Sequence, residues 1–189
     1  MRRPLRIVVL GILGRDPVAG VAWQGLHFLE GMRRLGHDVI YLEDTEDWAP
    51  DAADGCRQTT AYIARLMKWC GLGDRWAYRA VSAEGRVFGL SEARLEEALA
   101  RADALVNVTA STRLRDPHLR VPVRIYLETD PGLSQIAIAK GNRKVRDFLE
   151  AHTHHFTFGE NLGASDCLVP GIGIRFRATR QPVVIDWWS

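Results

Sequence analysis

The sequence predicts an α/β fold: an open, mostly parallel sheet of roughly five to seven strands with helices on both faces. Short apolar runs recur along the chain, and amphipathic helical patterns lie between them. Continuous apolar runs of this length are typical of strands that are covered on both faces of a parallel sheet. With 189 residues, of which 47% are hydrophobic and 25% charged, the chain is long enough to bury a core as one domain, 1–189.

The first unit of this pattern spans residues 5–43. Residues 5–11 form an apolar, β-branched run, and a glycine-containing loop follows. Apolar residues then recur every three to five positions as far as Leu35, and Gly36 ends the helix that this spacing predicts. Residues 38–43 form a second apolar strand. A strand, loop, helix and strand in this order indicate a right-handed crossover between parallel strands, as in Rossmann-like sheets.

The alternation continues to about residue 158. We expect helices over residues 58–70, 91–102 and 131–152, the last interrupted at Gly141–Asn142, and strands over residues 104–108, 123–128 and 155–158. Residues 86–88 are either a short strand or an extended link. The segment 159–189 is punctuated by glycine and proline and ends in Trp187 and Trp188. Two adjacent tryptophans need an apolar surface, so this segment either packs back on the domain or lies where a second domain begins.

Charge and composition narrow the classes of partner. The formal net charge is +2, from 25 basic and 23 acidic residues, which gives no overall electrostatic argument for binding nucleic acid or a membrane surface. No apolar run approaches the roughly 20 residues that span a bilayer. The apolar start resembles a signal peptide but lacks a cleavage site and ends at Arg15–Asp16–Pro17. Three widely spaced cysteines favour reduced thiols over a disulfide framework or a zinc site, so we expect a cytoplasmic protein.

Ligands of open α/β sheets bind beyond the carboxyl ends of the strands, so the loops there are the candidate sites. The first loop contains Gly11, Gly14 and Gly20 and precedes a helix N-terminus. Backbone N–H groups at such a terminus bind anions such as a pyrophosphate, and Arg15 can add a bidentate contact. The glycine spacing differs from GxGxxG, so it supports a dinucleotide site only weakly. The alternative is a turn that binds nothing.

The end of the second strand offers a further candidate. Glu43 stands where Rossmann enzymes keep the acid that binds the ribose of a dinucleotide. A simpler interpretation is a solvated carboxylate that opens the acidic segment 43–54.

Three histidines near the last strand raise the question of a metal site. In an extended segment, His152 and His154 face one way and His155 the other, so they cannot all converge with Cys167. We therefore expect one buried, hydrogen-bonded histidine and two surface histidines, with no metal and no bound cofactor.

Polar residues also follow two later strands. Thr129 and Asp130 come after the strand 123–128, where either side chain can cap the next helix or Asp130 can act as a general base toward a hydroxyl group. Glu160 and Asn161 follow the strand that ends at residue 158. In a parallel sheet these loops share one edge with the loop of Arg15, so we expect one crevice among them.

Five collinear segments carry a resemblance to a known family. They read VVLGILGRDPVAGVAWQGLHFLEGMRRLGHDVIYLED, GLGDRWAY, ETDPGLSQI, FTFGENLG and TRQPVVID. This combination resembles bacterial glycosyltransferases of the GT-B class, which consist of two Rossmann-like domains that face each other across a cleft. The resemblance covers nearly the whole chain.

The resemblance implies that the chain corresponds to the amino-terminal, acceptor-side domain, with the carboxyl-terminal donor domain absent. Its substrates would be a nucleotide-sugar and a small-molecule or glycan acceptor. The first loop, with Gly14, Arg15 and Gly20, would approach the donor phosphates. Asp130 would be catalytic or bind the acceptor beside Thr129, while Glu160 and Asn161 would border the cleft. Because an acid replaces the histidine common at such catalytic positions, the family's mechanism and stereochemistry do not transfer.

Two other functions stay open at this level. The chain can be a complete, non-catalytic binding or scaffold domain derived from such a half. It can also be a small Rossmann enzyme that uses a dinucleotide. If the chain is one half of a nucleotide-sugar transferase, we expect the isolated chain to fold but not to transfer sugar, because the donor must be held from both sides of the cleft.

Overall fold

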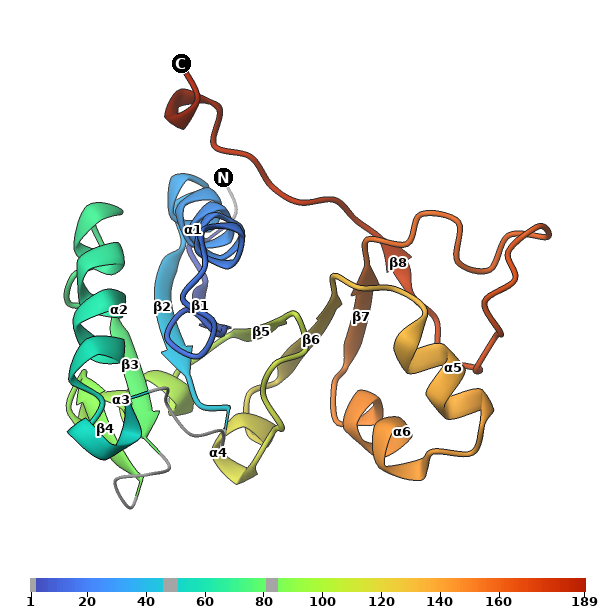
Figure 1. Ribbon diagram of the computed structural model, residues 1–189, viewed down its shortest axis with the longest axis horizontal. Coiled ribbons are helices and arrows are strands. Elements are labelled where there is room, and N and C mark those ends of the chain that lie inside the picture. Colours follow the sequence, from blue (N-terminus) through green and yellow to red (C-terminus); the bar gives the residue numbers. More distant parts are fainter. Residues whose placement is uncertain (1–2, 46–50, 81–84) are drawn as a thin grey trace.

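The computed structural model of the protein describes residues 3–45, 51–80 and 85–189. Within these residues the sheet has eight strands in the order β4-β3-β2-β1-β5-β6-β7-β8 (Figure 1). The strands are β1 (Arg6–Leu10), β2 (Asp38–Glu43), β3 (Trp76–Ala80), β4 (Arg86–Gly89), β5 (Ala104–Val108), β6 (Val123–Glu128), β7 (His154–Thr157) and β8 (Arg177–Ala178). All neighbouring strands pair in parallel except β3 and β4, which are antiparallel. This confirms an α/β fold with an open, mostly parallel sheet.

The strand order fixes where a ligand can bind. From β1 the chain first builds outward through β2 and β3, and it then returns to the other side of β1 with β5, β6 and β7. The adjacent strands β1 and β5 are therefore the point at which the order reverses. Crevices form at such a point because the loops after the two strands run in opposite directions. The parallel order β3-β2-β1-β5-β6-β7 is that of a Rossmann-like sheet.

The helices cover both faces of the sheet, as predicted. They are α1 (Ala19–Arg34), α2 (Arg57–Trp69), α3 (Glu92–Ala100), α4 (Asp116–Leu119), α5 (Leu133–Ala139) and α6 (Arg143–Glu150), with 3-10 turns at Ala52–Asp54 and Ile185–Trp187. On β1, Val9 packs in the same core cluster as α1 and α2, whereas Leu10 packs with α3. On β6, Tyr126 packs with α5 and α6, on the face opposite to α1. None of the described helices is long and apolar enough to span a bilayer.

The strand count exceeds the predicted range by one. Residues 86–88 form a strand, β4, but the prediction omitted β3 and β8. In β3 an arginine, Arg79, interrupts a short buried run, and its side chain reaches Asp44 at 3.7 Å. β8 has only two residues, and both are exposed, so no apolar pattern marks it. Its pairing with β7 is what makes it a strand.

The predicted helix over residues 131–152 consists of two helices. The break lies where expected: Gly141 has a positive φ of 86°, and the Asn142 side chain accepts a hydrogen bond from the Val145 N–H to begin α6. At the other end, α5 begins at Leu133, and Gly132 occupies its N-cap position. The interpretation of Thr129 or Asp130 as the helix cap is therefore wrong, because Pro131 and Gly132 separate even Asp130 from the helix.

The C-terminal segment packs back on the domain, which was one of the two expectations for it. Figure 1 shows it running from β8 across to α1. The Trp187 ring lies 4.8 Å from the ring of Trp69 on α2 and 5.9 Å from that of Trp23 on α1. Trp188 contacts Trp23 at 5.1 Å but stays 62% exposed.

Candidate functional site

A crevice of about 590 Å³ lies at the carboxyl ends of β1, β5 and β6. The loop after β1 and the first turns of α1 form one wall, which includes Arg15, Gly20 and Gln24. The turn after β5 (residues 109–111) and the loop after β6 (residues 129–130) form the other sides. The crevice is therefore at the point where the strand order reverses, as the fold predicts.

The structure brings four of the predicted site residues to this crevice and leaves three outside its lining. The four are Arg15, Gly20, Thr129 and Asp130. The three are Gly14, Glu160 and Asn161. Phe158, which directly precedes the Glu160 loop, does line the crevice.

Gly14 packs under α2 instead of facing the crevice. A Cβ atom at this position would lie 2.6 Å from Thr59 Cγ2 and 2.8 Å from Ile63 Cδ1. Glycine is therefore required here by the close approach of the loop to α2. At Gly20, by contrast, a Cβ would meet no atom within 4 Å, so the crevice is open beside the first turn of α1.

Glu160 and Asn161 bind their own neighbours. Arg180 donates two hydrogen bonds to the Glu160 carboxylate, and this contact lowers the pKa of Glu160. The Asn161 amide donates to Asp166 at 3.2 Å. Both side chains are exposed in the loop after β7. The expected convergence of Glu160 with Arg15 and Asp130 is therefore absent.

Glu43 is neither a ribose ligand nor a solvated acid. It is fully buried, and its carboxylate accepts hydrogen bonds from the backbone N–H groups of Gly14 and Arg15, each at 2.7 Å. The Tyr41 hydroxyl donates to the same carboxylate at 2.7 Å. Burial raises the pKa of Glu43, while the three donors act in the opposite direction. A buried acid of this kind shapes the first loop and cannot contact a ribose in the crevice.

The turn after β5 is part of the crevice that the sequence prediction missed. Thr109 and Ala110 have left-handed backbones, with φ of 60° and 52°, although neither is glycine. The buried Asn107 side chain holds this turn closed: it donates to the Thr112 carbonyl at 2.7 Å and accepts from the Thr112 N–H at 3.1 Å. Such strained backbone persists only where its surroundings fix it, and it concentrates at functional sites. The one available signal was an asparagine inside the otherwise apolar run ALVNV.

Two hydroxyl oxygens at this turn, those of Ser111 and Thr112, are buried and have no hydrogen-bond partner among the described residues. Of these two residues, only Ser111 belongs to the lining of the crevice. A bound ligand or water can therefore satisfy its hydroxyl.

His152 supports the same turn from behind. The Asn107 amide donates to His152 Nε2 at 3.1 Å, and His152 Nδ1 donates to the Phe148 carbonyl at 3.0 Å. This arrangement requires a neutral imidazole, and burial lowers the pKa of His152 to about 4. His152 is therefore the buried, hydrogen-bonded histidine that was predicted. Of the other two, His154 is exposed, but His155 is half-buried and bonds the Leu149 carbonyl.

The described residues form no candidate metal centre. No three or more His, Cys, Asp or Glu side chains converge there in a way that could hold a metal ion. All three cysteines are in the thiol form.

The two sides of the crevice differ in charge. At the first turn of α1, Val18 is the N-cap and makes no side-chain cap, and the turn contains no acid. Its backbone N–H groups give this side a positive potential, to which Arg15 adds a side chain that is 44% exposed and lies 3.6 Å from Asp16. Asp130 stands exposed at the end of β6. The crevice thus offers donors for an anion on one side and a carboxylate on the other.

Comparisons of the chain with protein-family models, with curated proteins and with solved structures found no match.

Proposed function

We propose that the chain is the acceptor-side domain of a glycosyltransferase, which moves a sugar from a nucleotide-sugar to an acceptor hydroxyl. The main observation in support is the crevice where the strand order reverses, with Arg15 and the first turn of α1 facing Asp130 and Thr129 across it. A nucleotide-sugar carries a diphosphate next to a sugar. Its site therefore needs hydrogen-bond donors for the diphosphate and, beside them, a group that can accept the proton of a hydroxyl. The two sides of the crevice have this chemistry.

In this proposal each side of the crevice has its own task. The first turn of α1 and Arg15 bind the donor diphosphate, which gains negative charge as the sugar leaves it. Asp130 accepts the proton of the acceptor hydroxyl as that oxygen forms the new glycosidic bond, and Thr129 orients the acceptor. A second, donor-binding domain holds the nucleotide from the opposite side. In this proposal the sugar transfer takes place in the cytoplasm, a compartment in which cysteine thiols stay reduced.

The geometry favours this function over a dinucleotide-dependent enzyme. Such an enzyme needs an acid at the end of the second strand to bind the ribose, and Glu43 is instead buried under the first loop. A binding or scaffold domain without catalysis uses the same crevice and is the main competitor. The ligand that the crevice binds distinguishes the two.

Calorimetric titration of the chain with nucleoside diphosphates tests the proposal. We expect measurable binding, and Arg15→Ala should weaken it by about 1–3 kcal/mol, because one charge-assisted partner is lost. Arg94→Ala, an exposed arginine on α3, is the matched control and should leave the affinity unchanged. Absence of binding, or equal losses in both variants, would contradict a diphosphate site and favour the scaffold domain.

A further inference from the structure

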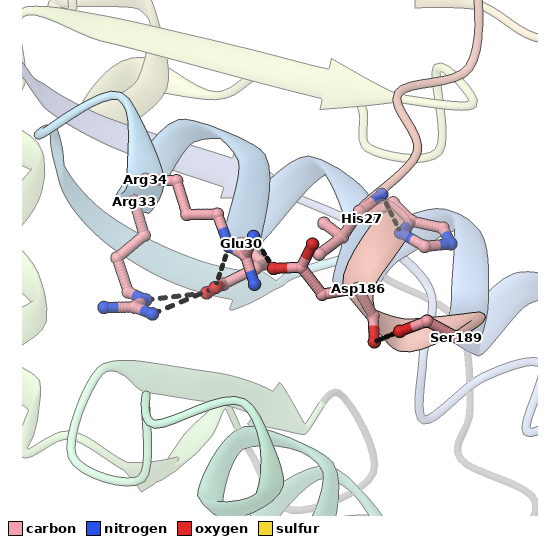
Figure 2. Close-up of polar contacts among 7 residues, drawn as sticks. His27, Glu30, Arg33, Arg34, Asp186 and Ser189 are labelled. Atoms are coloured by element: carbon pink, nitrogen blue, oxygen red, sulfur yellow. Dashed lines mark hydrogen bonds and ion pairs between the residues drawn. The ribbon is translucent and has the colours of Figure 1, made fainter.

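Residues 181–189, which we call the strap, lie along α1 (Figure 2). The Val184 N–H donates a hydrogen bond of 3.0 Å to His27 Nδ1, and Arg34 donates one of 2.7 Å to the Asp186 carboxylate. The Gln181 amide reaches the Gln24 carbonyl at 3.4 Å. Gln24 also lines the crevice, so the strap is attached to the helix that forms one of its walls.

The bond between Val184 and His27 exists in one protonation state only. A backbone N–H can only donate, so His27 Nδ1 must present its lone pair. A protonated imidazole carries a hydrogen on both ring nitrogens and cannot accept. Protonation would therefore place two donors 3.0 Å apart in a site where the Val184 residue is 5% exposed and the His27 residue 3%.

The surroundings of His27 also resist a positive charge. Its ring is stacked on Trp23 at 5.7 Å and on Trp187 at 5.1 Å, which shield it from water. The faces of these rings attract a cation, but burial dominates and lowers the pKa of His27 below the ordinary value. The strap therefore excludes the proton that an exposed histidine would take up.

The acids and bases around His27 are already paired with one another. On α1, the Glu30 carboxylate accepts from Arg33 and from Arg34, each at 2.7 Å. On the strap, Asp186 is held by the same Arg34, as Figure 2 shows. α2 contributes the neutral ring of Trp69 to the aromatic cluster. Each neighbouring carboxylate thus has a guanidinium partner and is not committed to stabilising a charged His27.

We propose that the strap is a pH-sensitive closure of α1: neutral His27 holds it in place, and protonation of His27 releases it. Each release takes up one proton, at His27 Nδ1, that the docked state excludes. The equilibrium constant for docking should therefore fall about tenfold between about pH 7.5 and about pH 5.5. Release uncovers Val184 and the aromatic surface formed by Trp23 and Trp69.

Hydrogen exchange of the Val184 amide measures this equilibrium directly. In the unaltered chain, the protection factor, corrected for the intrinsic exchange rate, should fall about tenfold over that pH range. At both pH values the Val184 amide should be less protected than the Leu29 amide in the core of α1, because release of the strap costs less free energy than global unfolding. A pH-independent protection factor at Val184, or equal protection factors at Val184 and Leu29, would overturn the proposal.

Two variants make the assignment to His27 specific. His27→Gln offers an oxygen that does not titrate, so its Val184 protection should not change with pH. His154→Gln, at an exposed histidine on β7, should keep the tenfold change. A tenfold change that persists in His27→Gln would assign the proton to another group and reject the proposal.

Asp186→Asn tests the strap without altering His27. Loss of the charge partner of Arg34 should lower the Val184 protection factor at both pH values while keeping their tenfold ratio. In the same variant, the pKa of His27 measured by NMR should move up toward the ordinary histidine value, because the docked state is less populated. A His27 pKa that does not respond to weaker docking would contradict the linkage between strap and proton.

Discussion

The loops on the two sides of the crevice are each held by one buried polar side chain. The two side chains differ in charge and in whether they come from the strand that precedes the loop. Glu43 on β2 holds the loop after β1, and three donors surround its carboxylate. Asn107 on β5 holds the turn after its own strand and uses both atoms of a neutral amide. The first loop therefore depends on the pairing of two strands, whereas the second depends on one strand and the residues that follow it.

This difference indicates which side of the crevice tolerates change. Removing the Glu43 carboxylate leaves three donors without their acceptor. Removing Asn107 leaves one N–H, one carbonyl and the nitrogen of His152 without partners. Three measurements separate the two sides.

The largest effect is expected at Glu43. Glu43→Ala should lower the free energy of unfolding by about 3–5 kcal/mol, because each buried donor that loses its acceptor costs roughly 1–3 kcal/mol. Urea denaturation measures this loss. Glu96→Ala, at an exposed glutamate on α3, is the matched control and should change stability by less than about 0.5 kcal/mol. Equal losses in the two variants would show that the first loop does not need its carboxylate.

A smaller loss is expected on the other side. Asn107→Ala should lower the free energy of unfolding by about 2–3 kcal/mol, since the Thr112 backbone groups and His152 lose neutral partners. Asn161→Ala removes the same side chain from an exposed loop and should cost less than about 0.5 kcal/mol in the same urea experiment. If Asn107→Ala proved more destabilising than Glu43→Ala, the order of the two loops would be reversed.

The third effect is a pH dependence of the free energy of unfolding, and it arises from His152, the hydrogen-bond partner of Asn107. The pKa of His152 is about 4 in the folded protein and about 6.5 when unfolded, so the unfolded state binds more protons between these values. Stability should therefore fall as the pH is lowered through this window, by about 2 kcal/mol between about pH 7 and about pH 5. Urea titrations of the unaltered chain and of His152→Gln measure the difference. The contribution of His27 is present in both and cancels, so identical slopes would exclude His152 as the group responsible.

The residue patterns predicted some of the side chains at the crevice correctly, but not all of them. Arg15, Gly20, Thr129 and Asp130 were predicted from their place after apolar runs, and they do line one cavity. Glu160 followed a strand as well, yet it pairs with Arg180, twenty positions along the chain. Position at the end of a strand predicts the edge on which a side chain lies, but it does not predict its partner.

The sequence by itself determined the strands β2, β5 and β6 to the residue and the helix that breaks at Gly141, because apolar runs, periodic spacing and helix breakers are properties of neighbouring residues. Tertiary structure alone decided the hydrogen-bond partners of Glu43 and His27. The Glu43 carboxylate meets the Gly14 N–H across a separation of 29 residues, and His27 meets the Val184 N–H across 157. Such contacts depend on which strands pair and on where a distant segment returns. A buried polar group finds its partner only when the chain is folded, so that partner cannot be predicted from the residues beside it.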